Sequence, residues 1–165
     1  MPSIPPEVLL EIELAGRIVL AFILGGVIGY ERELIRRPAG FRTHMLVCAG
    51  SAAFTIASDF AFPTQGTVRD PTRIAAQIVT GVGFLGAGTL WRAGTSVRGL
   101  TTAASIWLVA AVGVLAGSGL YLLAIFSTGL AFFVLYFLKA PRRRVRLGEP
   151  SIVPENRDEA DEEGE

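Results

Sequence analysis

The sequence contains few of the residues from which most enzymes and metal proteins build their sites. It has one cysteine, Cys48, and one histidine, His44, and 18% of its residues are charged, against about a quarter in a typical soluble domain. One cysteine excludes an internal disulfide, and one thiol with one imidazole is too few for a zinc site within one chain. The formal charge of +0 gives no indication of a nucleic-acid partner.

Acidic residues are absent from long stretches, namely 17–30, 43–58, 74–91 and 100–138. Mg²⁺ binds oxygen ligands and loses its water reluctantly, and transporters usually place their sites near the bilayer midplane. No second general base lies near His44 in the sequence. We therefore predict no enzyme, no cofactor and no resident metal, and the missing carboxylates argue against a chain that transports cations by itself.

Apolar stretches of membrane-spanning length dominate the chain, which is 51% hydrophobic. Segments 14–30, 43–62 and 73–91 are each near the ~20 residues that cross a hydrocarbon core of ~30 Å. Segment 100–138 would be about 60 Å long as one helix, so it must turn back. Gly117-Ser118-Gly119 suits a tight turn, which divides it into spans 100–117 and 120–138.

These segments predict an all-α fold, a polytopic transmembrane helix bundle of about five spans with a disordered acidic C-terminal tail. The alternative is a soluble bundle, which would need polar outer faces at helical spacing, and the last two spans have none. No basic residue precedes the first span, so we expect a permanent span rather than a cleaved signal. The predicted divisions are an extracytoplasmic segment 1–13, a transmembrane domain 14–138 and a cytoplasmic basic and acidic segment 139–165.

Basic residues near the span ends predict the orientation of the bundle. Five spans place the loops around 31–42 and 92–98 on the same side as the segment after 138, and these hold eleven Lys and Arg residues. The opposite side has Arg69 and Arg73, with Arg17 just inside the first span. We therefore expect a multi-pass protein of the plasma membrane with its N-terminus outside and its C-terminus in the cytoplasm.

Glycines recur at spacings typical of close helix packing. Residues 81–86 spell GxGxxG, but a dinucleotide site needs that motif after a strand in a βαβ unit, and here it lies in a predicted span. Small residues let two membrane helices approach closely. We predict such packing at Gly81, Gly83, Gly86 and Gly88, and at the pairs Gly25–Gly29 and Gly113–Gly117.

Polar residues also recur at helical spacing within the spans. Such residues are costly in lipid and usually face the bundle interior. They predict either hydrogen bonds between helices or an ion path, and we favour the first because hydroxyls and one thiol dominate near mid-bilayer. The residues are His44, Cys48, Ser51, Thr55 and Asp59 in the second span, Arg73, Gln77 and Thr80 in the third, and Thr101 and Ser105 in the fourth.

Two long strings carry a family resemblance. The segment ERELIRRPAGFRTHMLVCAG is followed by DPTRIAAQIVTGVGFLGAGTLWRAGTSVRGLTTAASIWLVAAVGVLAGSGLY. The chain from about Leu14 to Leu138 resembles the MgtC/SapB family of bacterial membrane proteins. The resemblance implies a bacterial inner-membrane protein linked to growth under magnesium limitation and, in pathogens, to virulence. Longer members carry a cytoplasmic ACT-like domain, so this chain resembles a short form without it.

The resemblance and the polar spacing together suggest a candidate functional polar face. Some family members have Asn where this chain has Thr101, so a hydrogen bond from an amide is not expected there. The predicted face comprises Glu31, Arg32, Arg42, Asp70, Arg73, Gln77, Thr101 and Thr102.

Two functions follow from the resemblance. The first is a non-catalytic regulator that binds other membrane proteins, for which the family suggests ATP synthase or P-type ATPases, and which is also compatible with a homo-oligomer in the lipid bilayer. The alternative is a Mg²⁺ transporter or channel subunit, as the family's name suggests. Glycine-rich helices favour the first, and the missing midplane carboxylates disfavour the second.

Overall fold

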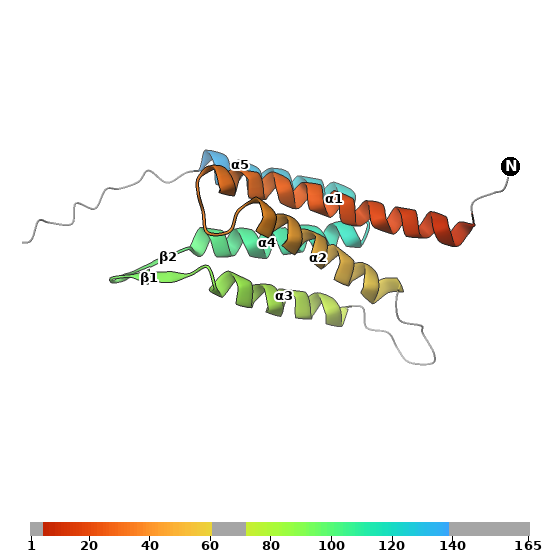
Figure 1. The fold of residues 1–165 in the computed structure, drawn as a ribbon, viewed down its shortest axis with the longest axis horizontal. Helices are drawn as coiled ribbons and strands as arrows, with labels where there is room; N and C mark the ends of the chain where they lie inside the picture. Colours follow the sequence, from red (N-terminus) through yellow and green to blue (C-terminus); the bar gives the residue numbers. More distant parts are fainter. Residues whose placement is uncertain (1–4, 61–71, 139–165) are drawn as a thin grey trace, which may run out of the picture.

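The computed structural model describes residues 5–60 and 72–138 of the chain. Within them, five helices run side by side along the long axis of the molecule, and a small antiparallel hairpin projects from one end (Figure 1). The elements are α1 (Pro6–Leu34), α2 (Phe41–Phe60), α3 (Thr72–Ala87), β1 (Trp91–Ala93), β2 (Ser96–Arg98), α4 (Leu100–Gly117) and α5 (Tyr121–Phe137). We call the end that carries β1 and β2 the hairpin end, and the opposite end, where α4 turns into α5, the turn end.

The two tight turns between helices are formed in the same way. At the end of α4, the N–H of Leu120 donates to the carbonyl of Leu115 and that of Gly119 to Ala116, and Gly119 has a φ of +78°. This is a Schellman motif, in which a left-handed residue satisfies the last carbonyls of a helix. The predicted turn at Gly117–Gly119 is thus confirmed.

At the end of α1 the same motif forms without glycine. The N–H of Arg37 donates to the carbonyl of Arg32 and that of Arg36 to Glu33, at 3.1 and 2.9 Å. Arg36 takes the left-handed position, with a φ of +53°. That conformation is uncommon for a residue with a Cβ, and here it turns the chain from α1 into α2.

Helix α2 lies between α1 and α4 at backbone contact distance. A Cβ built on Gly25 of α1 would lie 2.6 Å from the carbonyl oxygen of His44 and 2.7 Å from the Cβ of Cys48. On the other side of α2, a Cβ built on Gly113 of α4 would overlap the carbonyl oxygen of Cys48. Gly29 and Gly117 make similar approaches one turn away, so both predicted pairs, Gly25–Gly29 and Gly113–Gly117, pack as expected.

The main core surrounds this contact. Most of its members are small or β-branched, and several have no exposed surface, which fits close-packed helices. They include Ala21, Leu24 and Ile28 of α1, Cys48 and Ala52 of α2, Val109, Val112 and Ala116 of α4, and Ala124 and Ala131 of α5. Helix α3 lies at the edge of the bundle, where Ile78 and Val82 pack on Ile106 and Ala110 of α4.

Arg17 of α1 joins the helices at the turn end. Its guanidinium donates to the carbonyl of Gly117 at 3.0 Å and to the carboxylate of Glu13 at 2.7 Å. A cation beside the last carbonyls of a helix satisfies their unused acceptors and the negative end of the helix dipole. Arg17 thus caps α4 from a neighbouring helix.

The third predicted span ends earlier than expected. It was predicted to reach Trp91, but α3 ends at Ala87, and Trp91 begins a hairpin in which Trp91 pairs with Arg98. Gly94 has a φ of +62° at the first position of the two-residue turn, as a type II′ turn requires. The fold is therefore helical with one small sheet. Residues 88–91 are mostly apolar, but the glycine turn that follows them favours a hairpin over a longer helix.

The other helices lie where the sequence predicted them, with α1 extending past the predicted start at Leu14. Among the described residues, α4 alone is long and apolar enough to cross a membrane by length and composition, and half of it is buried in the bundle. Helices α3 and α5 are shorter and apolar. The predicted end of span 2 at Phe62, and the tail after 138, lie outside the described residues.

Two of the predicted packing glycines have no close neighbour in the part of the chain that the structure describes. A Cβ on Gly81 or Gly83 would meet nothing within 4 Å, whereas one on Gly86 would make ordinary contact with Ala103 of α4. A Cβ on Gly88 would meet only carbonyl groups of the preceding turn. Among the described residues no backbone approaches Gly81 or Gly83, so close packing against another chain stays a prediction for these two glycines.

These contacts predict opposite results for two matched substitutions. Gly113→Ala should lower the free energy of unfolding by about 1–3 kcal/mol, the usual cost of overpacking, because its methyl group would overlap a backbone carbonyl. Gly83→Ala should leave stability unchanged or raise it slightly, since Ala is the better helix former. Thermal unfolding of both variants in the same detergent measures the difference, and equal melting temperatures would contradict the packing described here.

Candidate functional site

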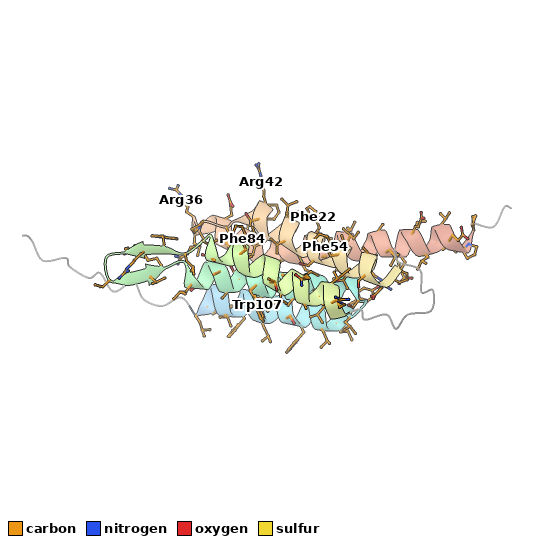
Figure 2. The ribbon with its side chains drawn as sticks, turned by 90° about the horizontal axis from the view of Figure 1, so that it is seen from below. Phe22, Arg36, Arg42, Phe54, Phe84 and Trp107 are labelled. Carbon is orange, nitrogen blue, oxygen red and sulfur yellow. The ribbon has the colours of Figure 1, made fainter. Side chains whose placement is uncertain are left out.

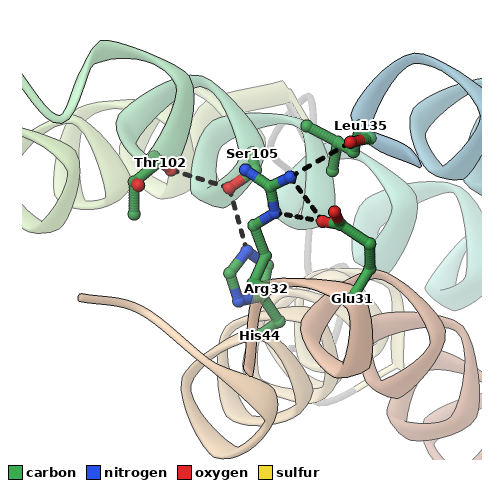
Figure 3. A network of polar contacts seen from close by, with 6 residues as sticks. All are labelled: Glu31, Arg32, His44, Thr102, Ser105 and Leu135. Carbon is green, nitrogen blue, oxygen red and sulfur yellow. Dashed lines mark hydrogen bonds and ion pairs between the residues drawn. The ribbon is translucent and has the colours of Figure 1, made fainter. Parts of the chain in front are cut away.

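A buried polar cluster lies at the hairpin end of the bundle, where four helices meet. It consists of Glu31 and Arg32 near the end of α1, His44 near the start of α2, and Thr102 and Ser105 near the start of α4 (Figure 3). None of these five residues is more than 4% exposed. We refer to them as the polar cluster.

The two charges of the cluster neutralise each other. The guanidinium of Arg32 donates through Nε and a terminal nitrogen to Oε2 of Glu31. It also lies 3.4 Å from the carbonyl oxygen of Leu135, near the end of α5. Because the C-terminal turn of a helix has carbonyls without intrahelical partners, Arg32 satisfies one of them and ties α1 to α5.

His44 links α2 to α4. Its Nδ1 lies 2.9 Å from the carbonyl oxygen of Gly40, and its Nε2 lies 3.0 Å from Oγ of Ser105. The Ser105 hydroxyl in turn donates to the carbonyl of Thr102 at 2.8 Å. Both ring nitrogens are therefore engaged, one with the residue that directly precedes α2 and one across to α4.

The positions of the protons in these hydrogen bonds depend on the charge state of the His44 ring. A carbonyl only accepts, so the contact with Gly40 places a proton on Nδ1 of His44. A neutral ring then accepts the Ser105 proton at Nε2. A protonated ring instead donates to Ser105 Oγ and leaves the hydroxyl proton for the Thr102 carbonyl. The link between α2 and α4 thus exists in both charge states of the ring, with the Ser105 hydroxyl rotated between them.

The predicted polar face is divided by the structure. Glu31, Arg32 and Thr102 belong to the cluster, whereas Arg42, Arg73, Gln77 and Thr101 are exposed on the bundle surface. Asp70 lies outside the described residues. Gln77 and Thr80 were expected to face the interior, but α3 packs through Ile78 and Val82 instead, so the polar residues of α3 point away from α4.

The polar stripe of the second span is confirmed at four positions. His44, Cys48, Ser51 and Thr55 are buried, although Thr55 donates only to the carbonyl of Ser51 in its own helix. His44 and Ser105 were noted in the sequence as polar positions but were not placed in the candidate face. The sequence could have drawn attention to His44, because it is the one histidine of the chain. Nothing in the sequence indicates that it pairs with Ser105, which lies 61 residues away.

The described residues contain no group of three or more His, Cys, Asp or Glu side chains placed to hold a metal ion. Glu31 is the buried carboxylate of the described helices, and its partner Arg32 already occupies it. The chemistry available in the cluster is thus hydrogen bonding and proton relocation around a neutralised ion pair.

The comparisons with known proteins agree with the resemblance seen in the sequence. The model of the MgtC family matches residues 18–144. "Putative magnesium transporter YhiD" of Escherichia coli (strain K12) is 46% identical over 123 residues, which cover 72% of this chain and 57% of that protein. "Protein MgtC" of Brucella abortus (strain 2308) is 53% identical over 100 residues, covering 61% and 40% of the two chains.

A third relative covers more of the chain. "Protein MgtC" of Salmonella paratyphi A is 41% identical over 140 residues, covering 85% of this chain and 58% of that protein. The chain therefore spans about half the length of the curated relatives it matches. No solved structure matches it.

The stability of the bundle should depend strongly on the pairing of Glu31 with Arg32 in the polar cluster. Glu31→Gln should destabilise the bundle by about 3–5 kcal/mol, because it leaves the Arg32 charge buried without compensation. The double variant Glu31→Gln, Arg32→Gln should recover part of that loss. Thermal unfolding in detergent measures both, with Glu11→Gln, at an exposed position of α1, as the control. A double variant less stable than Glu31→Gln would contradict the pairing.

Proposed function

This chain belongs to the MgtC family, and we propose that it is a non-catalytic regulator that binds other membrane proteins during adaptation to low magnesium. In this proposal all five helices cross the bacterial plasma membrane, the turn end faces outward, and the hairpin end faces the cytoplasm. The classes of partner that the family suggests are ATP synthase and P-type ATPases.

One observation carries the regulator proposal: the interior of the bundle is filled. Cys48, Ala52, Val109 and Val112 have no exposed surface, and Gly25 and Gly113 bring two backbones against α2 at that level. A path for a hydrated ion needs water-lined space, which such contacts remove. The polar cluster lies near one end, not at the middle where transport sites are usually placed.

The basic residues support the proposed orientation. Arg32, Arg36 and Arg37 at the end of α1, Arg42 at the start of α2, and Arg92 and Arg98 of the hairpin all belong to the hairpin end. Arg17, by contrast, contacts the turn end. An excess of arginine near one set of helix ends is typical of the cytoplasmic side.

Transport is the second candidate, and the name of the Escherichia coli relative favours it. An ion path would then run between copies of the chain, beside the polar cluster, whose own members are buried within one bundle. Thr102 and Ser105 are its hydroxyl-bearing members.

The topology can be tested at two exposed turn positions at opposite ends of α4. Thr95→Cys lies in the hairpin turn and Ser118→Cys in the turn between α4 and α5. We expect an impermeant thiol reagent to label Ser118→Cys in intact cells, and Thr95→Cys only after the membrane is opened. The unaltered chain is the control, because Cys48 is buried. Labelling of both positions in intact cells would contradict the five-span arrangement.

The choice between regulator and transporter can be tested with purified protein. In liposomes, we expect Mg²⁺ entry, reported by a trapped dye, at the rate of protein-free vesicles. In cells, affinity purification should recover a membrane-protein partner in greater yield at low than at high Mg²⁺. Saturable entry that Thr102→Val or Ser105→Ala abolishes would overturn the regulator proposal and support transport.

A further inference from the structure

An open basic pocket lies at the corner between α1 and α2, outside the polar cluster. It has a volume of about 800 Å³, and its lining includes Tyr30, Arg37, Phe41, Arg42 and Thr43. Tyr30 is 57% exposed, and the side chains of Arg36 and Arg42 extend from the same side of the bundle (Figure 2). We refer to this cavity as the corner pocket.

The corner pocket has a positive net charge, because its two arginines outnumber its one carboxylate. Its carboxylate, Glu33, accepts a hydrogen bond from the backbone N–H of Phe41 at 3.1 Å, so its negative charge already serves the first turn of α2. That turn has N–H groups without helical partners and the positive end of the helix dipole. Arg37 and Arg42 are exposed, and two guanidinium groups beside a helix start suit a phosphate.

An apolar groove lies further along α2, with its first lining residues one helical turn from Arg42 and Thr43 of the corner pocket. It has a volume of about 700 Å³ and lies between α2 and α3, with Leu46, Val47, Gly50 and Phe54 on the α2 side. Leu46 follows Arg42, and Val47 follows Thr43, by four residues, which places each pair on one side of the helix. A Cβ on Gly50, or on Gly81 across the groove, would meet nothing within 4 Å, so the groove is open where the two glycines face it.

The dimensions and charges fit a lipid. From Arg42 to Phe54 the helix rises about 18 Å, close to the ~15 Å that one leaflet contributes to a hydrocarbon core of ~30 Å. Arginine and tyrosine lie at the headgroup end, where both are favoured at a membrane interface. Basic pockets between membrane helices are known to bind anionic headgroups.

We propose that the corner pocket and the groove together bind one anionic phospholipid, with its phosphate on Arg37 and Arg42 and an acyl chain between α2 and α3. The site belongs to the leaflet at the hairpin end, so the assignment to the cytoplasmic leaflet rests on the orientation proposed above. The lipid fills the space between α2 and α3 and completes the packing of α3.

The test uses the purified full chain in nanodiscs of phosphatidylcholine with a rising fraction of phosphatidylglycerol. Thermal unfolding and native mass spectrometry report stabilisation and bound lipid. We expect phosphatidylglycerol to raise the melting temperature and to remain bound as one molecule per chain. Arg42→Gln should weaken that binding by about tenfold, the loss of one charge-assisted contact. Gly50→Leu, which places a bulky side chain where a Cβ meets nothing within 4 Å, should reduce acyl-chain binding similarly.

Two controls make the result specific. Arg92→Gln removes an exposed arginine of the hairpin, and Gly83→Leu enlarges an exposed glycine of α3; neither residue lines the pocket or the groove, and both variants should bind as the unaltered chain does. Three outcomes would overturn the lipid site. They are equal binding of phosphatidylcholine, stabilisation by inorganic phosphate alone, and an effect of Gly50→Leu that appears only as loss of dimers. These readouts need neither a partner protein nor ion flux, so they are independent of the regulator experiment.

Discussion

The fold depends on the contact of α2 with glycines on both of its sides. Cys48 of α2 lies against Gly25 of α1, and its carbonyl lies against Gly113 of α4. Side chains on these glycines would push the three backbones apart, and most residues of the core around them are accordingly small, namely alanine, valine and one thiol, beside Leu24 and Ile28. In a membrane, where apolar burial adds little between helices, such close packing is a main source of association.

This contact also places the polar cluster. With α2 held at Cys48, the residue one turn earlier, His44, faces the start of α4 and meets Ser105 at 3.0 Å. The same packing brings the end of α1 beside the end of α5, so that Arg32 contacts the carbonyl of Leu135 while pairing with Glu31 (Figure 3). Four helices are thus joined at the hairpin end by polar groups that would be costly if left without partners.

Helix α3 packs differently from the other helices. It packs through Ile78 and Val82 on α4 and leaves an open groove toward α2. The glycines of its GxGxxG string, which lies inside a helix, therefore serve two purposes. Gly86 lies at the contact with α4, while Gly81 and Gly83 leave space that no residue of 5–60 or 72–138 fills. A helix with one packed face and one open face is the element best placed to exchange contacts with lipid or with another protein.

The sequence by itself determined the helical class, the five helices and most of their limits, because hydropathy, helix length and the glycine turn at 117–119 are local properties. It also determined the burial of the polar stripe in α2, since only one face of a packed helix can hold such residues cheaply. It did not determine which glycines are in contact, because a glycine-rich helix carries the same signal whether or not another helix lies opposite, as Gly25 and Gly83 show. The rotation of the helices against one another decided two further features. It paired His44 with Ser105, and it separated the exposed members of the predicted polar face from the buried ones, Glu31, Arg32 and Thr102. That rotation is a property of the packed bundle, which no single segment encodes.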